Sequence, residues 1–118
     1  MRKKIMVVDD DPNIVKLLTF LLEKWGYEVS HSRDGLDCMS VVEYEKPDLV
    51  LLDIMMPGLD GISVCSEITT SFNIPVIIVS GLKKEKIKEE SEVFGALEFV
   101  PKPINSSELK KKVEKALQ

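Results

Sequence analysis

Short apolar runs alternate with longer amphipathic stretches along the chain. The apolar runs at 5–8, 49–52 and 76–79 are four residues long. Runs of this length, bounded by turn residues, are typical of strands that are buried on both faces of a sheet. Residues 27–30 alternate between apolar and polar side chains, which favours an edge strand, and a shorter run at 98–100 predicts a fifth strand.

Helical spacing fills the stretches between these runs. Apolar side chains spaced three and four residues apart from Ile14 to Trp25 predict the first helix, with Pro12 in its first turn and Gly26 beyond its end. Asn105, with a glutamate three residues later, predicts the start of the last helix. The remaining helices are expected at 34–46, 60–71 and 83–95.

The predicted order is therefore a strand and a helix, repeated five times. Strands joined by helix-length crossovers pair in parallel, and right-handed connections place helices on both faces of the sheet. This pattern predicts an α/β fold of the doubly wound (βα)5 type. Binding sites in such sheets lie beyond the carboxyl ends of the strands, where the strand order reverses, so functional residues are expected there.

Chemically active side chains follow four of the five predicted strands. The first strand is followed by Asp9 and Asp10, the third by Asp53, the fourth by Ser80 and Gly81, and the fifth by Lys102. Neighbouring carboxylates repel one another and need a cation, and oxygen ligands with room for water favour Mg²⁺. A carboxylate can also attack phosphorus as a nucleophile. A lysine, a hydroxyl and a glycine backbone beside it suit the oxygens of a transferred phosphoryl group.

Composition narrows the classes of protein further. The 118 residues predict one domain, and 44% hydrophobic with 31% charged residues is ordinary for a globular protein. The net charge of −4 argues against a nucleic-acid-binding surface, and the apolar runs are too short for a membrane span or a secretory signal. Cys38 and Cys65 form no metal-binding motif, which favours a reducing compartment. We expect a soluble intracellular protein.

Taken together, these motifs resemble the receiver domain of bacterial two-component response regulators. The resemblance rests on the paired aspartates after the first strand, on Asp53 within LLDIMMPGLDG, on Ser80, and on the Lys102-Pro103 dipeptide. It implies a flavodoxin-like, five-stranded parallel sheet of order 2-1-3-4-5. It also implies that residues 1–118 are a single receiver domain, with no output domain in this chain.

The resemblance assigns a role to each site residue. Asp53 is expected to be the phosphoacceptor, assisted by Ser80 and Lys102. A Mg²⁺ ion, with Mn²⁺ as an alternative, is expected to be bound by Asp10, Asp53 and the backbone carbonyl of Met55, with Asp9 acting through water. Ser80 and Phe99 stand at the family's switch positions, while Gly81 and Pro103 are expected to let the backbone approach the phosphate. The Lys102–Pro103 bond is often cis in the family.

The function implied is a signalling switch. A sensor histidine kinase or a histidine phosphotransfer protein would donate the phosphoryl group, and the switched form would bind a downstream protein or a second copy through the face formed by 83–117. Neither nucleic acid nor membrane is expected as a direct partner, and a cytoplasmic location is expected. The resemblance also implies that Met55 and Leu82 stand at the two positions that flank the approach of water in this family. Both are apolar here, which predicts slow self-catalysed dephosphorylation.

Other functions are less consistent with the residues. A Mg²⁺ phosphatase with an aspartate nucleophile typically has a second aspartate two residues later, where this chain has Met55. A receiver-shaped binding module without chemistry usually lacks an acid or the lysine, and a flavin-binding module would be repelled by the acidic loop after the first strand. We therefore expect a self-phosphorylating and self-dephosphorylating domain rather than a turnover enzyme.

Several polar residues have simpler structural interpretations. Asp11 and Asp60 are expected to cap helices, because an acid at a helix N-terminus is favourable. His31 is expected to lie in solvent after the edge strand, away from the other motifs. Both cysteines are expected to be buried as small apolar groups.

Overall fold

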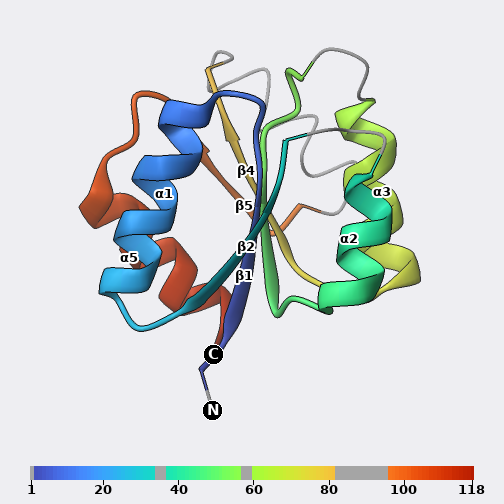
Figure 1. The fold of residues 1–118 in the computed structure, drawn as a ribbon, viewed down its shortest axis with the longest axis horizontal. Helices are drawn as coiled ribbons and strands as arrows, with labels where there is room; N and C mark the ends of the chain where they lie inside the picture. The colour runs from blue at the N-terminus through green and yellow to red at the C-terminus, as the bar shows by residue number, and fades with distance from the viewer. Residues whose placement is uncertain (1, 34–36, 57–59, 82–95) are drawn as a thin grey trace.

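Five parallel strands form the centre of the molecule (Figure 1). The computed structural model describes residues 2–33, 37–56, 60–81 and 96–118. Within these ranges the elements in chain order are β1 (Lys4–Val8), α1 (Pro12–Lys24), β2 (Glu28–Ser32), α2 (Cys38–Glu45), β3 (Leu49–Leu52), α3 (Gly61–Ser71), β4 (Val76–Ser80), β5 (Glu98–Pro101) and α5 (Ser106–Ala116). The strands lie in the order β2-β1-β3-β4-β5, and every neighbouring pair is parallel.

The helices cover both faces of the sheet. Figure 1 shows α1 and α5 on one side and α2 and α3 on the other, with the sheet seen nearly edge-on. The alternation of side chains along each strand divides the core accordingly: Ile5 and Val7 of β1 pack toward α1 and α5, whereas Met6 and Val8 pack toward α2 and α3. The central strands are thus buried on both faces, as their continuous apolar sequences predict.

Side-chain caps fix where three of the helices begin. Asp11 accepts a hydrogen bond from the Asn13 amide, Asp60 from the Ser63 amide, and Asn105 from the Glu108 amide. Each cap satisfies a backbone donor that has no partner within its helix. Because α1 starts shortly after β1, its cap also helps to hold the short loop that carries Asp9 and Asp10.

The structure confirms the predicted fold class, the parallel pairing and the strand order 2-1-3-4-5. The helix expected at 83–95 and the first residues of the helix expected at 34–46 lie outside the described residues. One placement was wrong, because His31 lies within β2 rather than after it. Backbone pairing with Val7 extends this edge strand past its apolar pattern, where an exposed side chain is tolerated.

Both cysteines are buried, as expected, and burial raises the pKa of the Cys38 and Cys65 thiols to about 11. Within the described ranges no helix is both long enough and apolar enough to cross a bilayer.

Candidate functional site

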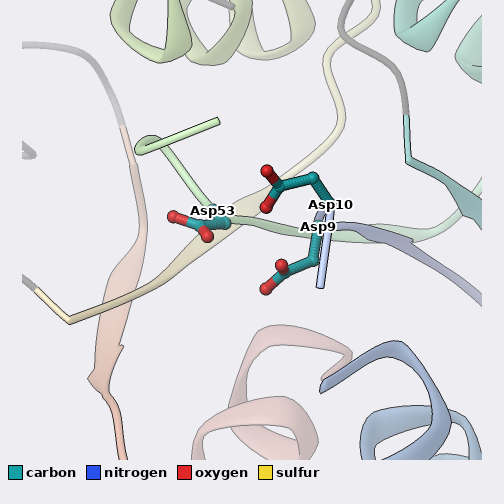
Figure 2. A group of neighbouring side chains, drawn as sticks. All are labelled: Asp9, Asp10 and Asp53. Carbon is teal, nitrogen blue, oxygen red and sulfur yellow. The ribbon is translucent and has the colours of Figure 1, made fainter. Parts of the chain in front are cut away.

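Three aspartates converge at the carboxyl ends of the adjacent strands β1 and β3. Asp9 and Asp10 directly follow β1, and Asp53 directly follows β3, where its amide donates to the carbonyl of Val8 at 2.9 Å. Figure 2 shows the side chains of Asp9 and Asp10 on opposite sides of the end of β1, with Asp53 beside them at the end of β3. One carboxylate oxygen from each of them lies within 4.8 Å of the others.

Two of these carboxylates are buried and paired with one lysine. Asp9 is 1% exposed and Asp53 is 6% exposed. The Nζ atom of Lys102, just after β5, lies 2.8 Å from Oδ2 of Asp9 and 3.0 Å from Oδ2 of Asp53. Burial lowers the pKa of Lys102, but the hydrogen bonds and negative charges of the two aspartates outweigh it, so the net pKa of Lys102 is raised. The lysine therefore stays charged between the two acids at neutral pH.

The other oxygens of the buried acids are held by backbone amides. Oδ1 of Asp9 accepts from the Asp11 amide and Oδ1 of Asp53 accepts from the Met55 amide, both at 2.9 Å. Together with Lys102, these contacts fix the orientation of each carboxylate from both sides. Asp10 is exposed, so its carboxylate faces the solvent side of the cluster.

Ser80 and Lys102 are brought to the same rim by β4 and β5. The Lys102 amide donates to the carbonyl of Ser80 at 2.9 Å, which ties the end of β5 to the end of β4. Ser80 is fully buried, Gly81 beside it is exposed, and the Lys102–Pro103 peptide bond is cis, as the family resemblance implied. The phosphate-facing roles expected of Gly81 and Pro103 stay predictions.

Phe99 lies on β5 with its ring turned inward. It is 4% exposed and packs with Ile78, its neighbour on β4. Lys112 of α5 reaches it from outside the sheet: its Nζ lies 5.3 Å from the ring centroid and donates to the Phe99 carbonyl at 2.7 Å. Nothing in the sequence pattern pointed to this contact, because Lys112 is one of several lysines along the last helix.

The sequence analysis also missed the contact between α3 and the residue after Asp53. A Cβ atom added to Gly61 would lie 2.6 Å from the Cα of Ile54, which is too close for any other residue type. Gly61 therefore lets the start of α3 pack against the loop that carries Asp53. The Asp60-Gly61 pair signalled a helix start, but only the fold shows what the glycine contacts.

The donor set fits a small divalent cation. Three carboxylates approach one another, and Lys102 is engaged by two of them at their Oδ2 atoms. The exposed position of Asp10 leaves room for water in the coordination shell, as Mg²⁺ prefers. The side chain of Met55 is 56% exposed, and the predicted role of its carbonyl as a ligand stays a prediction.

Comparison with known proteins gives an independent assignment. Residues 5–114 match the family model described as "Response regulator receiver domain". This range contains all the residues that form the acidic cluster and the lysine beside it.

Solved structures agree with this match. The BeF₃-activated N-terminal receiver domain of RstA from Klebsiella pneumoniae is 31% identical, with a TM-score of 0.92, over 98% of this chain and 99% of that one. A CheY-like receiver domain protein from Methanospirillum hungatei is 28% identical, with a TM-score of 0.91, over 99% and 94%. NtrX from Brucella abortus is 31% identical over 99% of this chain but only 27% of its own longer chain, with a TM-score of 0.90.

Proposed function

Because the chain belongs to the family of response regulator receiver domains, we propose that it is a signalling switch activated by phosphorylation of Asp53. The observation that carries this proposal is the position of Asp53. It is a buried carboxylate at the end of a central strand, beside a lysine ammonium and two further acids. That combination supplies a nucleophile, a cationic partner for phosphoryl oxygens, and a set of ligands for a divalent cation.

In the proposed reaction, an oxygen of Asp53 forms a bond to the phosphorus of a phosphohistidine. The phosphorus–nitrogen bond breaks at the same time, and the imidazole nitrogen keeps the electron pair. The Met55 amide holds the other face of the carboxylate at 2.9 Å and so orients it. Lys102, 3.0 Å from Oδ2 of Asp53, can transfer its hydrogen bond to an incoming phosphoryl oxygen, and the Ser80 hydroxyl donates a second one.

Asp10 and Asp53 would hold Mg²⁺ in this site, with the Met55 carbonyl as a third ligand and Asp9 acting through water. The ion would neutralise negative charge that gathers around the phosphoryl group. In its absence Lys102 carries this task alone, and it is already shared between Asp9 and Asp53. This shortage of positive charge is why we propose that labelling depends on a divalent cation.

Phosphorylation of Asp53 is proposed to change the conformation of β5, and this change would alter the surface that a partner binds. Ser80 and Phe99 lie on neighbouring strands, and Lys102 follows the same strand as Phe99. A hydroxyl that moves toward the phosphoryl group would change the packing around the ring and the adjoining surface of β5 and α5. We propose that a downstream protein or a second copy binds there, that a histidine kinase or phosphotransfer protein is the donor, and that the protein acts in the cytoplasm.

The experiment is intact-mass measurement after incubation with acetyl phosphate. With Mg²⁺, the wild type should gain one phosphoryl group, about 80 Da, and Asp53→Asn should gain none, because the substitution removes the carboxylate that is proposed as the nucleophile. Asp10→Asn is the matched control, since it changes the same residue type in the cluster but keeps the acceptor. It should be labelled only at higher Mg²⁺ concentration. Full labelling of Asp53→Asn, or full labelling of the wild type in EDTA, would refute the proposal.

The same measurement tests the lifetime of the phosphorylated form. Met55 is exposed beside the acceptor and has no polar group that could orient a water, so hydrolysis should be slow after the phosphodonor is removed. Met55→Asn should hydrolyse about tenfold faster. Equal decay rates would show that the side chain at this position does not control the attacking water.

A further inference from the structure

The first residue of α3 lies directly against the backbone that follows Asp53. Gly61 is buried, and a Cβ atom built on it would lie 2.6 Å from both the Cα and the Cβ atoms of Ile54. Non-bonded carbon atoms pack best at about 3.5–4.0 Å, so this Cβ atom would overlap with both. Because one of the crowded atoms belongs to the main chain, rotation of the Ile54 side chain cannot relieve the overlap.

Both partners of this contact are packed on their other sides. The side chain of Ile54 packs against Ile78 and Phe99, the buried pair of β4 and β5. Helix α3 is anchored in the core by Cys65 and Ile68, which are fully buried. Hydrogen bonds join the 11 residues of α3, whereas Ile54 belongs to neither a strand nor a helix. A side chain at position 61 would therefore displace the main chain at Ile54 before it displaced the helix.

The main chain at Ile54 also determines how the Asp53 carboxylate is held. The Asp53 amide donates to the Val8 carbonyl, which fixes the start of the turn to β1. Oδ1 of Asp53 accepts from the Met55 amide at 2.9 Å, and Ile54 is the single residue between the acceptor and this amide. A displacement at Ile54 would therefore move the Met55 amide away from the carboxylate, while Asp53 stays at the end of β3.

We infer that Gly61 is a positioning residue for the phosphoacceptor, because it allows α3 to support the turn that holds the Met55 amide against Oδ1 of Asp53. This inference rests on the proposed phosphorylation of Asp53. Oδ2 of the same carboxylate lies 3.0 Å from Nζ of Lys102, so the turn and the lysine together hold it in one orientation. Correct orientation of the attacking oxygen accelerates its reaction with phosphorus. Gly61 acts on the carboxylate through Ile54 and Met55.

Hydrogen exchange of the Met55 amide, followed by NMR, tests this support without a phosphodonor or a metal ion. In Gly61→Ala this amide should exchange about tenfold faster than in the wild type, because its bond to the Asp53 carboxylate opens more often. Ile62→Ala is the matched control, since it places an alanine at the next position of the same helix, where the side chain is exposed. It should leave the exchange of the Met55 amide unchanged.

The rate of labelling by acetyl phosphate tests the effect on the reaction. At saturating Mg²⁺, the maximal labelling rate of Gly61→Ala should fall about tenfold or more. The acetyl phosphate concentration that gives half of this rate should stay the same, because Lys102 and Ser80 are unchanged. Val113→Ala removes buried methyl groups from α5, on the opposite face of the sheet, and so destabilises the protein without crowding the turn. While folded, it should be labelled at the wild-type rate.

A second substitution tests the same support from the other side of the contact. Ile54→Ala keeps Gly61 but removes the side chain that packs against Ile78 and Phe99, so the Met55 amide should again exchange faster. Wild-type amide exchange in Gly61→Ala or in Ile54→Ala would overturn the inference, as would equal slowing of labelling in Val113→Ala. A wild type that is not labelled at all would instead refute the proposed function, and the amide exchange would still decide whether Gly61 supports the turn.

Discussion

The two edges of the sheet differ in how their outward backbone groups are satisfied. At the β5 edge, the Lys102 amide donates to the Ser80 carbonyl of β4. Because hydrogen-bonding direction alternates along a strand, the backbone N–H and C=O groups of Phe99 point away from β4, although its ring is buried. There the Phe99 carbonyl accepts from Lys112 at 2.7 Å, and its amide donates to Oε1 of Glu98 at 3.4 Å. At β2, the Glu28 amide donates to the Lys3 carbonyl, so the corresponding outward groups are those of Val29, and they have no partner among the described residues.

Side chains of the protein therefore satisfy the outward backbone groups of Phe99 on β5, but no described side chain does so for Val29 on β2. At β5 a single lysine joins the edge to a helix, because Lys112 also contacts Glu108 of α5 at 2.9 Å and lies over the Phe99 ring. The closed edge carries the residue expected to respond to phosphorylation. The open edge is the one where the outward backbone groups of Val29 have no partner among the described residues.

The largest change in the free energy of unfolding is expected from proline substitutions in β2, where one amide faces β1 and the next faces outward. Ser30→Pro removes an amide that faces β1 and should lower the free energy of unfolding by about 3 kcal/mol or more. His31→Pro removes an amide that faces outward and should lower it by less than about 1 kcal/mol. Urea denaturation of dilute protein measures both values. Similar losses for the two variants would mean that β2 is not an open edge.

A smaller change in the free energy of unfolding is expected when the side-chain partner of the Phe99 carbonyl on β5 is removed. Lys112→Met keeps most of the aliphatic chain but leaves the Phe99 carbonyl without its ammonium donor and removes the cation over the ring. We expect a loss of about 1–3 kcal/mol in the free energy of unfolding. Lys111→Met, at the neighbouring exposed position of α5, is the control and should change the free energy by less than about 0.5 kcal/mol. Equal effects would show that Lys112 does not protect this edge.

The sequence predicted the parts of the molecule that depend on local patterns. Continuous apolar runs identified the central strands, and short polar signals identified the helix starts at Asp11, Asp60 and Asn105. The carboxyl-end rule then brought Asp53 and Lys102 to one rim, which the structure confirms at 3.0 Å. These predictions succeed because periodicity and capping are encoded within a few neighbouring residues.

Contacts between distant segments could not be predicted in this way. Lys112 lies thirteen residues from Phe99, and its position over the ring depends on how α5 packs beside β5. The close approach of Gly61 to Ile54 likewise depends on the tilt of α3. The residues beyond Ser30 continue β2 although their side chains lack the alternation seen at 27–30, because pairing with β1 involves only the backbone.

The smallest change in the free energy of unfolding is expected from a substitution of Glu98. It tests whether the Glu98–Lys112 ion pair stabilises the β5 edge in addition to the hydrogen bond from Lys112 to the Phe99 carbonyl. Its Oε1 lies 3.6 Å from Nζ of Lys112, and its side chain is 37% exposed, so water and salt screen the pair. Glu98→Gln keeps an oxygen for the Phe99 amide but removes the charge, and should cost less than about 0.5 kcal/mol. In a double-mutant cycle with Lys112→Met, the coupling energy should be equally small and should vanish in high salt. A coupling energy close to the full effect of Lys112→Met would mean that an ion pair, rather than the bond to the Phe99 carbonyl, protects this edge.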